Sequence, residues 1–284
     1  MKLNQEEIDK IIQQLTSYSG IVPRDAHRTS LSKFVEERET SLADGDEEFS
    51  YSEYLSENPA EMTELVDMAT VNETYFFREE KQFLLLKQKI LPEIYKTTKA
   101  PIKIWSAACS SGEELYSLML LADSCDIPCE CFGSDINTKV LKKCRLGAYT
   151  KNSLRKGDGA MFHNLLSAYK NENCGVDLPQ EIRNRAQFEK INLAKLSNPQ
   201  SIFGPSAISL APKNQDLIFV RNVFIYFSRE LRKKILAALT EKCLVPGGYL
   251  FVSMNEIASL DSSLIPSGLT KFMDGKVFYF RKDF

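Results

Sequence analysis

The residues that could carry chemistry gather between Ile102 and Asp135. A short apolar run leads into a turn of small residues that ends at Gly112, and an amphipathic helix is predicted from Glu113 onward. A second apolar run follows and ends on Asp135. This order of strand, tight turn, helix, strand and acid is half of a nucleotide-binding α/β unit, in which the acid accepts hydrogen bonds from ribose hydroxyls.

The turn departs from the pattern of a dinucleotide site. It holds only Gly112 in place of a G-x-G-x-x-G run, and two acids, Glu113 and Glu114, follow directly. These acids would repel a pyrophosphate at the helix N-terminus. A ligand with a ribose and a cationic group fits better, and S-adenosylmethionine (SAM) has both. The alternative is that the two glutamates only complement the helix dipole; Asp135 in register favours SAM.

Composition sets the broad class of protein. An apolar content of 43% and a charged content of 26% are typical of a globular chain, and 284 residues suffice for one large or two modest domains. A net charge of −2 gives no overall attraction to nucleic acid or an anionic membrane. We expect no transmembrane segment, no signal peptide and a reducing, cytoplasmic location, because the seven cysteines lack disulfide-like spacing. Cys125, Cys129 and Cys131 lack partners for a tetrahedral set, so we expect no metal.

The first part of the chain is predicted to be helical. Apolar periodicity indicates helices over residues 5–18, 24–39, 50–58 and 59–70, with an acidic loop at residues 42–48. The aromatic stretch VNETYFFREE at residues 71–80 connects this part to the rest. We therefore expect an N-terminal helical domain with its connecting segment over residues 1–78 and a second domain over residues 79–284.

The second domain is predicted to alternate helices and strands. Helices are expected at 81–96, 138–144 and 229–243, and strands at 186–191, 216–220 and 249–253, the last after a turn at Pro246–Gly248. Asp274-Gly275 between two strand-like segments predicts a hairpin. Residues 160–187 fit neither pattern and indicate an inserted substructure. The fold class is α/β: a mostly parallel, Rossmann-like methyltransferase sheet with an antiparallel C-terminal hairpin, after a small all-α domain.

Four segments in this order resemble the CheR family of chemotaxis receptor methyltransferases. They are NETYFFRE (72–79), WSAACSSGEELYS (105–117), GSDIN (133–137) and RNVFIYF (221–227). The resemblance implies methyl transfer from SAM to glutamate carboxylates in the cytoplasmic domains of chemoreceptors, by a monomer that neither binds nucleic acid nor enters the membrane. It also implies a small β-rich subdomain at about 160–187, and receptor contact by the basic residues of the predicted 24–39 helix.

The resemblance also implies roles for particular residues. Glu114 and Asp135 would hold the methionine and ribose ends of SAM. Asn192-Leu193 and Asn222-Val223 would line its adenine and its middle. Asn72, Thr74 and Arg78 would cap the site from the side of the helical domain, and Tyr226 would face the reacting methyl. The turn Ser253-Met254-Asn255-Glu256 differs from the Gly-His-Ser-Glu-like turn of the family.

These residue types suit the expected chemistry. A glutamate carboxylate is ionised at neutral pH, so a displacement at the sulfonium methyl needs no general base, only orientation. Arg78 is able to hold the incoming carboxylate by a charge-assisted pair. Two other hypotheses stay open: a methyltransferase for a different protein or a small molecule, and a regulatory module that binds SAM or S-adenosylhomocysteine without turnover. Arg78 and Tyr226 disfavour the second, since a sensor has no need of them.

Overall fold

The computed structural model describes residues 5–43, 49–196 and 210–284. It begins with four helices, here called the helical region: α1 (Gln5–Ser19), α2 (Asp25–Leu42), α3 (Tyr51–Glu57) and α4 (Pro59–Ala69). The four helices confirm the sequence prediction. The apolar stripe of α1 (Ile8, Ile11 and Leu15) is buried in a small core shared with α3 and α4, as its helical spacing indicates. The predicted acidic loop lies mostly outside the described residues. Over the described ranges, no helix has the length and apolarity needed to cross a membrane.

A seven-stranded sheet forms the larger part of the molecule, with the strand order β5-β2-β1-β6-β7-β9-β8. The strands are β1 (Ile102–Ala107), β2 (Cys129–Asp135), β5 (Ala186–Lys190), β6 (Gln215–Phe219), β7 (Leu244–Phe251), β8 (Leu269–Asp274) and β9 (Val277–Lys282). The first five in the order are parallel, whereas β9 is antiparallel to both β7 and β8. This arrangement confirms the predicted mostly parallel sheet with an antiparallel C-terminal hairpin.

The central strands are apolar on both faces, as buried parallel strands must be. In β1, Ile102 and Ile104 pack into the core on one side of the sheet, and Trp105 packs into the core on the other. The same division holds in β6, where Leu217 and Ile218 point to opposite cores. Two hydrophobic cores therefore sandwich the sheet.

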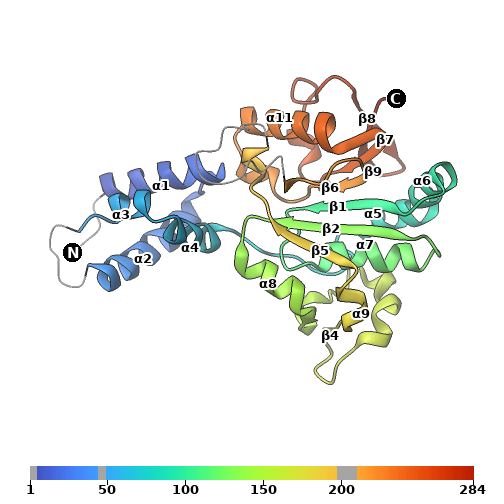
Figure 1. Cartoon of the computed structure of the whole chain (residues 1–284), viewed down its shortest axis with the longest axis horizontal. Coiled ribbons are helices and arrows are strands. Elements are labelled where there is room, and N and C mark those ends of the chain that lie inside the picture. Colours follow the sequence, from blue (N-terminus) through green and yellow to red (C-terminus); the bar gives the residue numbers. More distant parts are fainter. Residues whose placement is uncertain (1–4, 44–48, 197–209) are drawn as a thin grey trace.

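Helices cover both faces of the sheet (Figure 1). On one side lie α5 (Glu80–Leu85), a π-turn (Leu86–Ile90), α6 (Leu91–Thr98), α7 (Glu113–Asp123) and α8 (Thr138–Leu146). On the other lies α11 (Arg229–Ala238), which ends in a second π-turn (Leu239–Cys243). Because β2 and β6 flank β1 on opposite sides, the chain reverses its direction of winding between β1 and β6. Ligands of such sheets bind at this reversal, outside the carboxyl ends of the strands.

The helical region meets the sheet at these carboxyl ends (Figure 1). Asp67 of α4 accepts hydrogen bonds from the backbone N–H and the hydroxyl of Thr138, at 2.8 and 2.7 Å, and so completes the N-terminus of α8. The buried Asn137 donates its amide to the Asp67 carbonyl (2.9 Å) and to the Thr70 hydroxyl (2.6 Å). These bonds fasten the two parts together beside the end of β2.

The segment between α8 and β5, residues 147–185, is here called the insert, and it is longer and less strand-rich than predicted. It contains a two-residue strand pair, β3 (Ala148–Tyr149) with β4 (Val176–Asp177). The remainder includes two 3₁₀ helices (Lys151–Ser153 and Ala160–Tyr169) and the short α9 (Gln180–Arg183). Residues 186 and 187 belong to β5 of the main sheet. The expected β-rich subdomain at 160–187 is thus mainly helical and irregular.

The predicted turn at Pro246–Gly248 lies inside a strand. β7 starts at Leu244, and its pairing with β6 shifts register between Gln215 and Leu217, so Pro246-Gly247-Gly248 forms a bulge in β7. At the other end of the sheet, Asp274 pairs with Val277, which confirms the hairpin around Asp274-Gly275.

Candidate active site

A cleft lies at the carboxyl edge of the sheet, between β1, β2 and β6 and the segment that leaves the helical region. It encloses about 900 Å³, counting the space at its open mouth. Its walls come mainly from residues 69–78, 108–110, 135–136, 191–193 and 221–227. All ten residues singled out from the sequence line it: Asn72, Thr74, Arg78, Glu114, Asp135, Asn192, Leu193, Asn222, Val223 and Tyr226.

Asp135, the last residue of β2, lines the cleft and is only 7% exposed. One carboxylate oxygen accepts the backbone N–H of Ser110 and the other that of Asn137, each at 2.9 Å. Burial raises the pKa of Asp135 to about 6, although these backbone donors oppose the shift. A carboxylate oxygen has room for a second donor, so Asp135 is able to accept two hydroxyls without giving up its backbone bonds.

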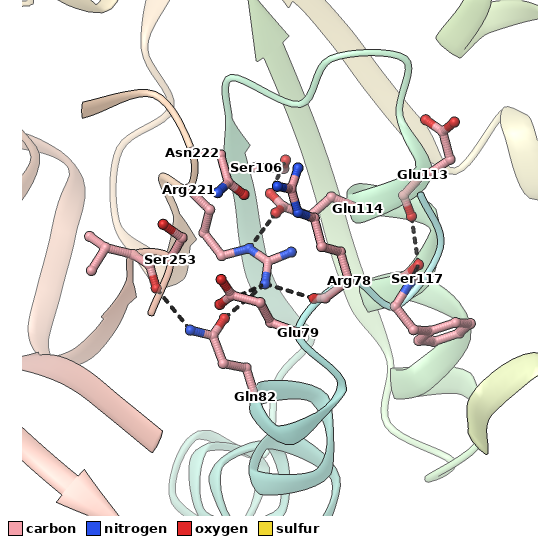
Figure 2. A network of polar contacts seen from close by, with 12 residues as sticks. Arg78, Glu79, Gln82, Ser106, Glu113, Glu114, Ser117, Arg221, Asn222 and Ser253 are labelled. Atoms are coloured by element: carbon pink, nitrogen blue, oxygen red, sulfur yellow. Dashed lines mark hydrogen bonds and ion pairs between the residues drawn. The ribbon is translucent and has the colours of Figure 1, made fainter. Parts of the chain in front are cut away.

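Glu114 is held in the wall of the cleft by Arg221, the second residue after β6 (Figure 2). One Glu114 oxygen accepts the Ser106 hydroxyl at 2.6 Å, and the other accepts Nε of Arg221 at 2.6 Å. The guanidinium also lies 3.6 Å from the carboxylate of Glu79, and the Arg221 side chain is only 2% exposed. Arg221 therefore neutralises two acids in a buried setting.

A second nitrogen of Arg221 fixes the connecting segment. Its Nη1 donates to the backbone carbonyl of Arg78 at 2.8 Å and to the Gln82 amide oxygen at 2.9 Å. Gln82 is fully buried and donates in turn to the carbonyl of Val252 at 2.8 Å. One arginine thus joins the ends of β6 and β7 to the segment that carries Arg78.

Arg78 itself is half-buried at the cleft. Its Nη1 donates to the Glu73 carbonyl at 2.8 Å, and its guanidinium lies 5.5 Å from the centre of the Tyr75 ring. Asn72 stands nearer to β1, where its carbonyl accepts the Ser110 hydroxyl at 3.1 Å. Thr74 lies between them along the same wall.

The helical region supports another part of the cleft wall. Asn192 donates its amide to the Tyr18 carbonyl at 2.6 Å, and Leu193 beside it is buried. Tyr226 accepts the backbone N–H of Val22 at its carbonyl (2.9 Å), and its ring lies 6.4 Å from that of His27. The turn between α1 and α2 thus supports the loop that carries Tyr226.

Sequence reasoning missed two residues that shape the cleft. One is Arg221, although an arginine directly after an apolar strand indicates a buried charge that needs acidic partners. The other is Glu256, 1% exposed, which accepts the backbone N–H of Asn222 at 2.8 Å. This bond holds Asn222 in a left-handed conformation (φ 57°) and keeps Val223 at the cleft. The unusual 253–256 turn is the signal that could have revealed Glu256.

The charges around the cleft fit SAM better than a phosphate ligand. Its charged lining residues are three acids (Glu73, Glu114 and Asp135) and two arginines, of which Arg221 is already paired. At the start of α7, where a phosphate would bind, Glu113 and Glu114 are both buried. An excess of acid with a buried carboxylate at the end of β2 suits a ligand with a cationic group and a ribose.

Comparison with known proteins supports this assignment. Residues 72–270 match the family model described as CheR methyltransferase, SAM binding domain. The chain is 34% identical over 202 residues to chemotaxis protein methyltransferase 1 of Pseudomonas aeruginosa, with 68% of each chain covered. It is 30% identical over 266 residues to the chemotaxis protein methyltransferase of Salmonella typhimurium, with 90% of this chain and 85% of that one covered.

Among solved structures, PigF with SAH aligns with 98% of this chain and 72% of its own, at a TM-score of 0.39 and 11% identity. The family match covers most of the chain, including every wall of the cleft except the turn between α1 and α2 and the end of α4. The chain therefore belongs to the CheR methyltransferase family, and it is a SAM-dependent methyltransferase of chemotaxis.

Proposed function

We propose that the enzyme methylates glutamate side-chain carboxylates in the cytoplasmic domains of chemoreceptors. The observation that carries this proposal is the contrast between two arginines at one cleft. Arg221 is already paired with the carboxylates of Glu114 and Glu79, whereas Arg78 has no carboxylate within 4.0 Å among the described residues. A half-buried guanidinium that holds only a backbone carbonyl has donors left for an incoming carboxylate.

The chemistry asks little of the protein beyond placement. SAM supplies an electrophilic methyl group on a positively charged sulfur. An acceptor glutamate is ionised at pH 7, so Arg78 needs only to hold one of its oxygens and leave the other aimed at the methyl. Tyr226 lines the cleft, and its ring lies beside that of His27 of α2. In this position it is suited to shield the reacting atoms from water.

The proposal assigns the ten lining residues the roles expected from the sequence, with Asn72, Thr74, Glu114, Asp135 and the pairs at 192–193 and 222–223 holding SAM.

The proposal also includes a division into a helical domain (residues 1–78) and a methyltransferase domain (79–284). In this proposal an acidic surface of the receptor meets α2 and the preceding Arg24, which donates to the Ile225 carbonyl at 3.4 Å, close to Tyr226. The seven cysteines are all free, which supports a cytoplasmic enzyme; we propose that it acts as a monomer.

A labelling experiment tests the substrate. The purified enzyme is mixed with methyl-labelled SAM and a chemoreceptor signalling-domain fragment, and the product is treated with base. We expect volatile label from the fragment, because methyl esters hydrolyse in base whereas N-methyl groups do not. Stable label on the fragment, or none from an enzyme that binds SAM, would reject glutamate as the acceptor. The Asp135→Ala enzyme is the matched control.

Asp135 predicts how SAM binding depends on pH. Hydroxyl donors stabilise its charged form, and its pKa is about 6 in the free protein, so binding below pH 6 must first remove a proton. We expect affinity to be constant above pH 7 and to fall by up to about tenfold per pH unit below 6. Calorimetry between pH 5 and 8 measures this.

In the Asp135→Asn protein we expect a lower SAM affinity at pH 7.5 that no longer changes with pH. The Asp135→Ala protein should bind SAM weakly at every pH between 5 and 8 while remaining folded. Equal affinity of the native enzyme at pH 5 and pH 8 would contradict the role of Asp135 as a ribose acceptor.

A further inference from the structure

The segment that carries Arg78 has a strained backbone conformation that other parts of the chain must stabilise. Residues 75–80, here called the arch, include two non-glycine residues in the left-handed region, Phe77 (φ 57°) and Glu79 (φ 62°), on either side of Arg78. Such conformations persist only where surrounding groups enforce them. The direction in which Arg78 leaves the arch therefore depends on contacts made by other parts of the chain.

Three such contacts come from one carboxylate in the insert. Asp158 accepts the backbone N–H of Glu79 at 2.6 Å and the Tyr75 hydroxyl at 2.8 Å on one oxygen, and the N–H of Glu80 at 2.8 Å on the other. It thus replaces a side-chain cap at the start of α5, whose own N-cap residue, Glu79, provides none. The bonding is reciprocal, since the Glu80 carboxylate accepts the N–H of Gly159 at 3.0 Å.

The insert also touches the arch directly. Gly159 has φ +86°, and a Cβ there would lie 2.6 Å from the Phe76 carbonyl oxygen. Only glycine permits this approach, and it seats Asp158 beneath the arch. Although burial opposes it, the donors from Glu80, Glu79 and Tyr75 hold the pKa of Asp158 below its ordinary value. The carboxylate is therefore charged at neutral pH and is a strong acceptor for all three bonds.

Tyr75 extends this support to the arginine side chain. Its hydroxyl is fixed by Asp158, and its ring contacts the guanidinium of Arg78 at 5.5 Å. The backbone of Arg78 adjoins Glu79, which Asp158 also holds. We propose that Asp158 is a positioning residue, which fixes the arch and the Tyr75 ring so that the Arg78 guanidinium faces the acceptor carboxylate. This inference rests on the proposed function, in which Arg78 holds that carboxylate.

A double-mutant cycle tests the proposal. In the Asp158→Ala enzyme we expect kcat for receptor methylation to fall by about tenfold, with the dissociation constant of SAM changed by less than about twofold. In an Arg78→Ala background the same substitution should cost nothing further, because the group it positions is gone. Tyr75→Phe, which removes one of the three bonds and keeps the ring, should give a smaller loss and guards against misfolding of the first variant.

Ser50→Ala is the matched control, because Ser50 caps α3 of the helical region by accepting the N–H of Glu53, far from Arg78 in the chain. It should lower the melting temperature without changing kcat. The proposal is overturned if Asp158→Ala lowers kcat by the same factor with and without Arg78, or if SAM affinity falls as much as kcat.

A second readout needs no receptor. In protein labelled with ¹⁵N-arginine, the Nε–H resonance of Arg78, assigned by its loss in Arg78→Ala, should move toward the position of a solvated arginine in Asp158→Ala. An unmoved resonance would overturn the positioning role of Asp158, whatever the substrate of the enzyme. Failure of the native enzyme to methylate receptor glutamates would instead reject only the proposed function.

Discussion

Replacing Arg221 by methionine is expected to cost about 3–5 kcal/mol of the free energy of unfolding. The substitution keeps the length of the side chain but leaves Glu114 and Glu79 without their cation in a place where the arginine is only 2% exposed. It also leaves the carbonyl of Arg78 and the amide of Gln82 without a donor. Domains of this kind are stable by about 5–15 kcal/mol, so urea denaturation followed by circular dichroism resolves a loss of this size.

The chain offers a matched control for this substitution. Arg185 makes a two-pronged pair with Asp123, at 2.8 and 2.6 Å, but both side chains are more than a third exposed. Arg185→Met should therefore cost less than about 1 kcal/mol. Similar losses in the two variants would mean that burial of Arg221 does not determine its effect.

Replacing Arg78 by alanine is expected to lower kcat for receptor methylation by about 10- to 100-fold. A hydrogen bond to a charged group contributes about 1.5–3 kcal/mol, which corresponds to this range of rates. SAM affinity should change by only a few-fold, since Arg78 is one of many lining residues and the cofactor's own cation gains nothing from it. Single-turnover kinetics with saturating SAM, together with calorimetry of SAM binding, separate the two effects.

Arg78→Lys is the control for the second prediction. It retains the charge but loses the planar fork that fixes a carboxylate by two bonds, so an intermediate rate is expected. Unchanged turnover in Arg78→Ala would show that Arg78 does not hold the acceptor.

Much of the fold could be predicted because its pattern is local. A few neighbouring residues are enough to indicate several of the elements. Examples are the apolar runs of β1 and β6, the apolar stripe of α1 and the Asp274-Gly275 turn. The family resemblance placed Asp135 and Asn222 at one site, and they line one cleft, because the carboxyl ends of parallel strands share one edge of the sheet.

What could not be predicted depends on contacts distant in the chain. The pair of β3 and β4 is two residues long, too short for any periodicity, and its two strands lie near opposite ends of the insert. Arg221 meets Glu114 across 107 positions, and Asp158 meets Glu79 across 79. A single sequence indicates that Arg221 is a buried charge and that Asp158 is an acid in a loop, but it does not indicate which residues bind them.

The contact of Asp67 with Thr138 limits how these enzymes can be recombined. The helical region carries the surface proposed to meet the receptor, so exchanging it between relatives is an obvious way to redirect an enzyme to a new receptor. Such a hybrid also replaces the acid that completes α8, and the Thr70 hydroxyl that holds Asn137 next to Asp135. A working hybrid must therefore cross over before Asp67 and keep the host's own residues from there to the end of the arch.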